Sequence, residues 1–247
     1  MSDERGVAVV TGASAGIGAA TARHLHEAGF EVIVGARRAD RLGDVAKAIG
    51  AKALALDVRD PESVAAFAAA IPRCDVLVNN AGGAFGLGPL ADADEDQWRA
   101  MWETNVFGLM LVTRALLPKI ESGGRGHIVN IGSIAGFETY VGGAGYTAVK
   151  HAVRAISRTL RLELLGKRVR ITEIDPGLVE TEFSLVRLGD PERAKKVYEG
   201  LTPLTADDIA ECVTWSVTRP WHVNIDEMVV RPLAQACANA VARNAGL

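Results

Sequence analysis

Tyr146 and Lys150 stand out as polar residues in a stretch of small and apolar side chains, AGYTAVKHAV at 144–153. Residues four apart on an α-helix lie on the same face. A free phenol has a pKa of about 10 and is a poor base at neutral pH. A cation one helical turn away favours the phenolate and lowers that pKa. The pair therefore predicts an acid/base group, although the polar edge of an ordinary amphipathic helix could carry the same two residues.

Hydride transfer between an alcohol and a carbonyl needs an acid/base group of this kind. Reduction of the carbonyl requires a proton donor at the developing alkoxide, and oxidation of the alcohol requires the same group as a base. The hydride itself must come from a cofactor. A tyrosine tuned by a lysine would serve this chemistry in both directions, and it would require a nucleotide site elsewhere in the chain.

A glycine-rich segment, TGASAGIG at 11–18, directly follows an apolar run and opens an amphipathic one. Gly12 permits a tight turn, while Gly16 and Gly18 let a pyrophosphate approach backbone N–H groups at a helix N-terminus. The spacing differs from G-x-G-x-x-G, and no Lys-Ser/Thr pair follows as in a P-loop. An ordinary glycine-rich turn is the alternative, but the position at the first strand–helix junction favours a nucleotide site.

The second expected strand ends in Gly35-Ala36-Arg37-Arg38. An NAD site places an acid near this point for the ribose 2′-hydroxyl, whereas arginine suits a 2′-phosphate. Arg37, with Ser14 as a hydroxyl donor, therefore predicts NADP. Two solvated arginines at the start of a helix are the alternative, and we expect nearby Asp40 to cap that helix.

Short apolar runs alternate with longer amphipathic stretches along the chain. The expected strands are near-continuous Val, Ile and Leu, as in parallel sheets covered on both faces. They lie at Val7–Thr11, Glu31–Ala36, Ala53–Leu56, Asp75–Asn79, His127–Ile131, Val169–Ile174 and Glu227–Val230. The expected helices lie at Ile17–Ala28, Asp40–Ile49, Pro61–Ala70, Asp94–Lys119, Tyr146–Leu165 and Ala206–Thr218.

This alternation predicts an α/β fold, a Rossmann-type doubly wound parallel β-sheet flanked by helices on both faces. No linker or repeat interrupts it, so we expect a single domain over residues 1–247. Residues Leu178–Leu204 show mixed polarity and no clean period. We expect a loop or short-helix lid there, near the carboxyl ends of the strands, where such sheets bind ligands.

Composition narrows the classes of partner. A net charge of −3 gives no general reason to expect binding to nucleic acid or to a membrane surface. No apolar run approaches the ~20 residues of a membrane span, and the polar, acidic N-terminal stretch predicts no signal peptide. The 3 cysteines and 5 histidines show no metal-ligand spacing, so no metal is expected. Reduced thiols in the cytoplasm fit the cysteines best.

Six motifs occur in one order across nearly the whole chain: TGASAGIG at 11–18, NNAG at 79–82, TNVFG with Asn105, NIGSIAG with Ser133, YTAVK at 146–150 and DPG at 175–177. The set resembles the classical short-chain dehydrogenase/reductase family. The resemblance implies that Tyr146 is the acid/base and that Lys150 tunes it and anchors a nicotinamide ribose. It also implies that Ser133 orients the carbonyl and that Asn105 holds a water in the proton relay.

The resemblance implies an NADP(H) site, with Asp57 and Val58 flanking the adenine. It places the cofactor half at about residues 1–135 and the catalytic and lid part at about residues 136–247, and it suggests a homotetramer. The residues expected to bind the cofactor are Gly12, Ser14, Gly16, Ile17, Gly18, Arg37, Arg38, Asp57, Val58, Asn79, Ala81, Gly82, Tyr146, Lys150, Pro176, Gly177, Val179 and Thr181.

The segments at 35–42, 175–190 and 198–232 resemble bacterial NADP-dependent 3-hydroxy acid dehydrogenases, which act on serine, allo-threonine and 3-hydroxypropionate. Such substrates carry a carboxylate, so a cation should lie near the pocket. Arg187 in the expected lid is the candidate, beside Ser133, and an arginine paired on the surface is the alternative. Two other functions stay open: a broad-substrate aldehyde or ketone reductase of secondary metabolism, and a non-catalytic NADP-binding sensor or scaffold.

Overall fold

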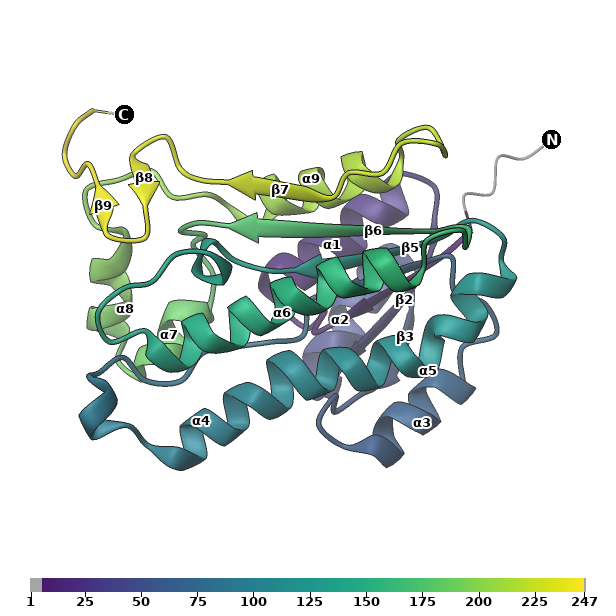
Figure 1. The fold of residues 1–247 in the computed structure, drawn as a ribbon, viewed down its shortest axis with the longest axis horizontal. Helices are drawn as coiled ribbons and strands as arrows, with labels where there is room; N and C mark the ends of the chain where they lie inside the picture. The colour runs from purple at the N-terminus through teal and green to yellow at the C-terminus, as the bar shows by residue number, and fades with distance from the viewer. Residues whose placement is uncertain (1–5, 247) are drawn as a thin grey trace.

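A parallel β-sheet runs through the centre of the molecule (Figure 1). The computed structural model describes residues 6–246; residues 1–5 and 247, which include the start of the polar N-terminal stretch, lie outside the described residues. The strands of the sheet are β1 (Val7–Thr11), β2 (Glu31–Ala36), β3 (Lys52–Ala55), β4 (Val76–Asn79), β5 (Gly126–Ile131), β6 (Val169–Pro176) and β7 (Glu227–Val230). All the expected strands are confirmed, with ends that move by one or two residues.

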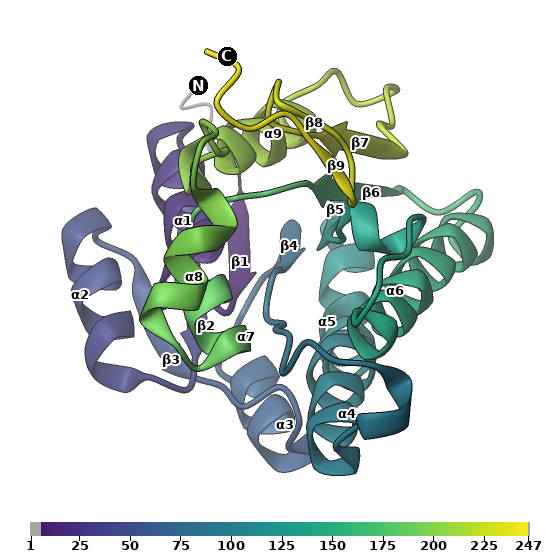
Figure 2. The same ribbon diagram turned by 90° about the vertical axis from the view of Figure 1, so that its left-hand side faces the viewer.

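The strand order is β3-β2-β1-β4-β5-β6-β7, and every neighbouring pair is parallel. The order reverses between β1 and β4, because the chain first builds outward to β3 and then returns to the other side of β1. Such a reversal opens a crevice beyond the carboxyl ends of the strands, where doubly wound folds bind ligands. Figure 2 views the molecule from this end.

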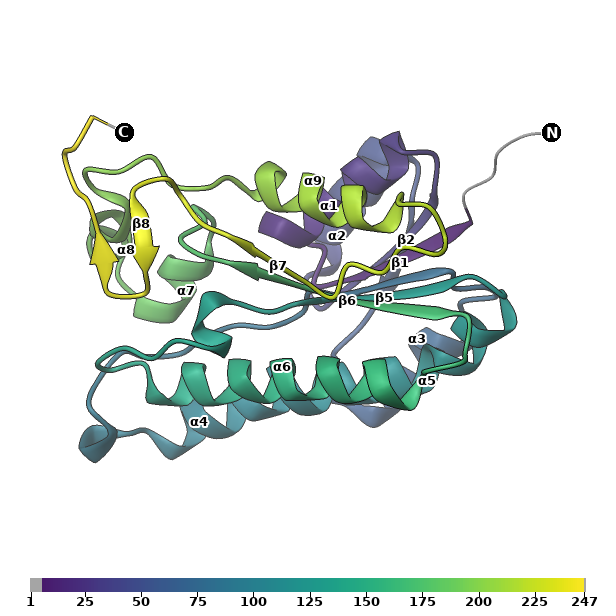
Figure 3. The ribbon, with the colours of Figure 1, turned by 45° about the horizontal axis from the view of Figure 1, so that its top comes forward.

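Helices cover both faces of the sheet (Figure 3). One face carries α1 (Gly16–Glu27), α2 (Ala39–Ile49) and α9 (Ala206–Val217). The opposite face carries α3 (Pro61–Ala69), α5 (Gly108–Ser122) and α6 (Ala144–Glu163). The predicted doubly wound α/β fold is confirmed.

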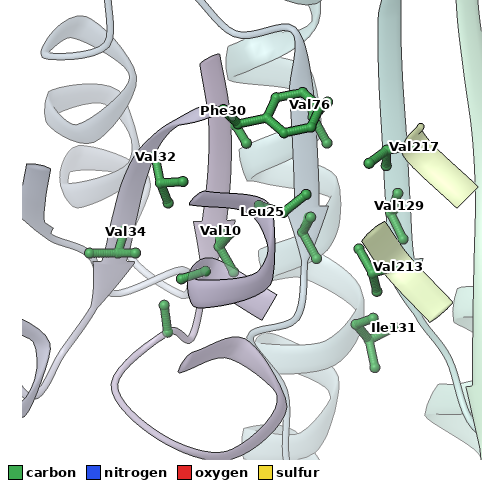
Figure 4. Packing of buried hydrophobic residues seen from close by; sticks show 14 of the residues in the cluster. Val10, Leu25, Phe30, Val32, Val34, Val76, Val129, Ile131, Val213 and Val217 are labelled. Carbon is green, nitrogen blue, oxygen red and sulfur yellow. The ribbon is translucent and has the colours of Figure 1, made fainter. Parts of the chain in front are cut away.

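Alternate residues of the central strands supply the two cores. Val9 and Val10 are both buried, but successive side chains of a strand point to opposite faces. Val10 belongs to the same core as Leu25 of α1 and Val213 of α9, part of which Figure 4 shows, whereas Val9 belongs to the core under α3 and α5. This burial on both faces explains why the strands are apolar throughout rather than alternating.

Helices α3 and α2 begin differently. Asp60 caps α3, because its side chain accepts from the backbone N–H of Glu62 and Pro61 follows at the first helical position. The expectation that Asp40 caps α2 is wrong: the helix begins at Ala39, so Asp40 lies inside the first turn. Its negative charge in the first turn still stabilises the helix, because it interacts favourably with the helix dipole.

The long helix expected at Asp94–Lys119 is interrupted. It consists of α4 (Glu95–Trp102), a π-helical turn η2 (Glu103–Phe107) and α5. Asn105 lies in this turn, and its amide donates to the carbonyls of Met101 (2.9 Å) and Gly83 (2.8 Å). A π turn inserts one residue into a helix and often marks a functional position. Here it aims Asn105 at the loop that follows β4.

Short elements cover the carboxyl ends of the strands, where Leu178–Leu204 was expected to form a lid. They are α7 (Phe183–Leu188), α8 (Pro191–Tyr198) and an unpredicted hairpin of β8 (Gln235–Cys237) and β9 (Ala240–Val241). Tyr198 Oη donates to the Val179 carbonyl (2.8 Å), and Gln235 Oε1 accepts from the Leu178 N–H (2.9 Å). Two 3₁₀ turns, η1 (Leu90–Asp92) and η3 (Ile134–Gly136), complete the elements. Within residues 6–246, no helix is both long and apolar enough to cross a membrane.

We predict that Leu77→Ala lowers the free energy of unfolding by about 2–5 kcal/mol, because Leu77 is 0% exposed in the middle of β4 and its removal leaves a cavity. Urea denaturation followed by circular dichroism measures the change. Leu90→Ala is the matched control, since this leucine is 65% exposed and its truncation should cost less than about 0.5 kcal/mol. Equal effects of the two variants would contradict the packing described above.

Candidate active site

A cavity of about 790 Å³ lies at the carboxyl ends of the strands, between the glycine loop and the lid. This volume is in the range of small-molecule and cofactor sites. Most of the residues expected at the site line the cavity together: Gly12, Ser14, Gly16, Ile17, Arg37, Arg38, Asp57, Val58, Ala81, Gly82, Ser133, Tyr146, Lys150, Pro176, Gly177, Val179, Thr181 and Arg187.

The glycine loop is shaped by close contact with the end of β4. Gly12 has φ of +66°, and a Cβ atom there would lie 2.8 Å from Ala81 Cα. The Thr11 hydroxyl accepts from the N–H groups of Asn80 and Ala81, both at 3.1 Å, which fixes the loop to that strand. Helix α1 begins at Gly16 with no acidic residue in its first turn. Backbone N–H groups at a helix N-terminus, next to a cradle that side chains would fill, fit the pyrophosphate of a dinucleotide.

Three predicted residues do not line the cavity. A Cβ at Gly18 would lie 2.6 Å from the Gly12 carbonyl, so this glycine permits close packing of α1 on the loop. Asn79 is buried, and its amide donates to Asn130 Oδ1 (2.9 Å). Asn105 is engaged by the Gly83 backbone. Their contacts with a cofactor or a relay water remain predictions.

The basic end of the cavity brings together residues that were expected to bind the cofactor. Ser14 Oγ accepts from Arg38 Nε at 3.1 Å. Arg37 lines the cavity as well. Asp57 forms an ion pair with Arg59 (2.7 Å), and this hydrogen bond, more than the charge of Arg37, lowers the pKa of the carboxyl. Cationic groups therefore gather at the end of β2, where a ribose phosphate would lie.

Sequence reasoning missed several cavity residues. Asn80 stands in the NNAG motif, and its side chain donates to the carbonyls of Thr11 (2.9 Å) and Gly12 (3.2 Å). Tyr140 and Glu182 also line the cavity. The NNAG motif could have pointed to Asn80, but no pattern marked the other two, whose positions depend on long-range packing.

Tyr146 and Ser133 meet at the centre of the cavity. Tyr146 and Lys150 lie one turn apart on α6, and Lys150 Nζ is 5.8 Å from the centroid of the tyrosine ring. Lys150 donates to the Ile131 carbonyl at 2.8 Å. Ser133 caps η3 with its hydroxyl, which lies near the Tyr146 phenol and acts to lower its pKa. A carbonyl oxygen at this point could receive two hydroxyl donors.

The pKa of Tyr146 moves against our expectation. Burial raises it to about 12, and the hydrogen bond with Ser133 and the charge of Arg187 only partly oppose this rise. Burial lowers the pKa of Lys150 to about 8, against the charges of Glu173 and Asp175. The direction of this shift is therefore opposite to the expected lowering of the phenol pKa, because burial outweighs the nearby charges. At neutral pH Tyr146 is protonated and can act as a general acid.

Arg187 lies over the same tyrosine. Its guanidinium carbon is 5.3 Å from the centroid of the Tyr146 ring, and its Nη1 donates to Tyr140 Oη at 2.9 Å. Arg187 Nε donates to the Gly86 carbonyl at 3.1 Å. The alternative of an arginine paired on the surface is wrong, because this cation faces the cavity beside Tyr146.

Two buried carboxyl groups on β6 lie next to the Ser133 segment of the site. Glu173 and Asp175 are alternate residues of β6, and Asp175 Oδ1 accepts from the Ser133 N–H at 2.8 Å. Burial, and then the charge of Glu173, raises the pKa of Asp175 to about 8. Arg154 Nη1 lies 4.0 Å from the other oxygen of Asp175. Asp175 thus positions the backbone that carries the Ser133 hydroxyl. Among residues 6–246, no group of three or more His, Cys, Asp or Glu side chains could hold a metal ion.

Comparison with known proteins gives consistent matches. A family model described as short chain dehydrogenase matches residues 6–187. An uncharacterized oxidoreductase of Mycobacterium tuberculosis (strain H37Rv) is 60% identical over 234 residues, which cover 94% of this chain and 93% of the relative. An NADP-dependent 3-hydroxy acid dehydrogenase of Salmonella typhi is 46% identical over 240 residues, covering 94% and 97% of the two chains. A solved closed form of serine dehydrogenase complexed with NADP⁺ superimposes with a TM-score of 0.92 at 41% identity, covering 96% of this chain and 99% of that chain.

We predict that Asp175→Asn flattens the pH dependence of stability. The carboxyl pKa is 3.8 in the unfolded chain and about 8 in the folded protein. Between these values only the unfolded chain releases the proton, so stabilisation present below pH ~4 is lost as pH rises to about 8. The variant keeps an oxygen for the Ser133 N–H but cannot ionise.

Urea denaturation at about pH 5 and about pH 8 tests this prediction. Between these pH values the free energy of unfolding of the wild type should fall by at least about 1 kcal/mol more than that of the variant. This difference is smaller than the ~1.4 kcal/mol that corresponds to a pKa shift of one unit. Asp44→Asn, at an exposed position of α2, is the control and should follow the wild type. The same slope for Asp175→Asn and wild type would show that Asp175 is ionised in the folded protein.

Proposed function

The chain belongs to the short-chain dehydrogenase family, and on this basis we propose an NADP(H)-dependent oxidoreductase that acts on small 3-hydroxy acids or their carbonyl partners. The observation that carries the proposal is the placement of a cation, Arg187, beside the Tyr146–Ser133 pair in one cavity. The protonated phenol can serve the reacting oxygen while the guanidinium binds a carboxylate.

NADP(H) is the cofactor that the cavity supports. The glycine cradle and the start of α1 would hold the pyrophosphate, and Arg38, Arg37 and Ser14 would meet the 2′-phosphate. The nicotinamide supplies or accepts the hydride when the cofactor is bound. The relatives described as NADP-dependent support this choice. We place cofactor recognition in about residues 1–135 and the catalytic and lid part in about residues 136–247.

Proton transfer involves residues of α6 and the residue that caps η3. Tyr146 donates its proton to the developing alkoxide, and its pKa of about 12 keeps that proton in place until the oxygen becomes basic. Ser133 binds the same oxygen and orients the carbonyl. Lys150, held by the Ile131 carbonyl, places a cation near the phenol and a ribose hydroxyl. We further propose that Asn105 holds a relay water through the atoms that now bond to Gly83.

The substrate class follows from Arg187. A 3-hydroxy acid carries its carboxylate two carbons from the reacting carbon, so a carboxylate-binding group should lie close to the acid/base residue. Arg187 satisfies this requirement, and its contact with Tyr140 Oη adds a second polar group at the same point. A broad aldehyde or ketone reductase is the second candidate, because Leu87, Val141 and Phe183 also line the cavity and would accept neutral substrates. The convergence of Ser133, Tyr146 and Lys150 argues against a pure scaffold.

We also propose a homo-oligomer, a tetramer by family resemblance, that resides in the cytoplasm. Apolar side chains stand exposed on η2 and at the end of α6, among them Phe107 (54%) and Leu162 (74%), and such surface favours association. The three cysteines Cys74, Cys212 and Cys237 are free, as is usual in a reducing compartment.

We predict that Tyr146→Phe lowers kcat by about 10²–10⁴-fold, the usual contribution of general acid/base catalysis. The assay follows NADPH oxidation with a panel of small carbonyl compounds, including 3-oxopropionate. The Kd for NADPH, measured by nucleotide fluorescence, should stay within about twofold because the ring remains. Substantial turnover by the variant would remove Tyr146 from its role. Absence of turnover in the wild type, with NADPH still bound, would favour the scaffold.

We predict that Arg187→Gln raises KM for L-serine and 3-hydroxypropionate by about 10- to 100-fold, because a hydrogen bond to a charged group is worth about 1.5–3 kcal/mol. Neutral secondary alcohols, oxidised with NADP⁺ by the same variant, are the internal control. Their KM should change little, since they carry no carboxylate. A parallel rise in KM for both classes would indicate a general role of Arg187 in shaping the lid.

A further inference from the structure

Tyr140 places a phenolic hydroxyl in the cavity next to the guanidinium of Arg187. The oxygen of this hydroxyl accepts from Arg187 Nη1 at 2.9 Å. An arginine carries only donors, so it cannot bind the hydrogen of the phenol in return. Arg187 is the hydrogen-bond partner of the hydroxyl among residues 6–246, which leaves the phenolic O–H to donate to a ligand. The proton-transfer scheme above does not use Tyr140.

The Tyr140 hydroxyl keeps its hydrogen at neutral pH. Burial raises the pKa of this phenol, and the charge and the hydrogen bond of Arg187 oppose the rise only in part. An ionised Tyr146 would raise the pKa of Tyr140 further, because the two phenols lie close enough for their charges to interact. Tyr140 is therefore a neutral donor close to the acid/base residue.

A tight turn before α6 fixes the position of the Tyr140 ring. The Gly143 N–H donates to the Tyr140 carbonyl at 3.1 Å. The ring packs directly on Gly143, where a Cβ atom would collide with it. The phenol is thus held by its own turn, so its place in the cavity does not depend on Arg187 alone.

Two tyrosine rings flank the guanidinium of Arg187. Its central carbon lies 5.4 Å from the centroid of the Tyr140 ring and 5.3 Å from that of the Tyr146 ring. Its Nε donates to the Gly86 carbonyl at 3.1 Å, while one N–H of Nη1 is engaged by Tyr140. The other N–H groups of the guanidinium fork can bind a carboxylate. A carboxylate bound there would lie next to the Tyr140 hydroxyl, because that hydroxyl contacts the same guanidinium.

We propose that the Tyr140 hydroxyl donates a hydrogen bond to the substrate carboxylate that Arg187 binds, and that Tyr140 thereby determines specificity for 3-hydroxy acids. The inference rests on the proposed function and adds a direct contact to its carboxylate site. A carboxylate has two oxygens with about four lone-pair sites, so it can accept from a charged donor and a neutral donor at once. Two donors at different positions also fix its orientation. A substrate with an apolar group in place of the carboxylate gains nothing from the hydroxyl.

Oxidation of 3-hydroxypropionate with saturating NADP⁺ tests the contact. Tyr140→Phe removes the hydroxyl and keeps the ring, and it should raise KM about 10-fold, the effect of losing a hydrogen bond to a charged group, with kcat within about threefold. The KM for reduction of 3-methylbutanal, in which an isopropyl group replaces the carboxylate of 3-oxopropionate, should stay within about twofold. Thr139→Val removes a hydroxyl from an exposed neighbour that does not line the cavity, and this matched control should behave as the wild type does.

The double variant Tyr140→Phe/Arg187→Gln separates direct contact from support of Arg187. If the hydroxyl contacts the carboxylate, Tyr140→Phe should raise KM for 3-hydroxypropionate at least about threefold in the Arg187→Gln background as well. No further rise would overturn the inference, because Tyr140 would then act only by positioning Arg187. An unchanged KM in the single variant, or an equal rise for 3-methylbutanal, would overturn it too.

Arg187→Gln alone separates this inference from the proposed function. If it raises KM equally for 3-hydroxypropionate and 3-methylbutanal, or if the wild type does not oxidise 3-hydroxypropionate, the carboxylate site fails and both proposals fall. If Arg187→Gln discriminates between the two compounds and Tyr140→Phe behaves like Thr139→Val, only the role of Tyr140 is lost.

Discussion

The parallel course of every strand in the sheet is the constraint on which the site depends. Because neighbouring strands all run in the same direction, their carboxyl ends meet at one edge, and the loops that follow them must share that edge. The reversal of strand order between β1 and β4 separates the loops there and leaves room for a ligand. Residues as distant in sequence as Gly12, Ser133 and Gly177 therefore line one cavity. Apolar burial on both faces of the sheet fixes their positions.

Burial also determines the proton affinities inside that cavity. Tyr146 and Asp175 hold their protons more tightly than in water, whereas Lys150 holds its proton less tightly. All three shifts favour the neutral form, as desolvation requires. A bound cofactor and a substrate carboxylate would add negative charge, which the cations of Lys150 and Arg187 are placed to meet.

The sequence was sufficient to predict the fold and most lining residues, because both depend on local patterns. Apolar runs marked the strands, and the one-turn spacing of Tyr146 and Lys150 marked the helical face. The sequence could not predict contacts between residues that are far apart in the chain. The hydrogen bond between Arg38 and Ser14 depends on how the chain leaves β2. The direction of the Tyr146 pKa shift depends on burial, and Glu182 meets its arginines across 141 and 144 residues of chain.

Six consecutive residues of the lid, Glu182 to Arg187, contact both ends of the cavity. Glu182 meets the arginines beside the glycine loop, while Arg187 covers the acid/base tyrosine. Both contacts belong to α7 and the residue before it, because Glu182 precedes the helix and Arg187 lies in its last turn. One short segment of the lid therefore contacts both the arginines that follow β2 and the tyrosine of α6.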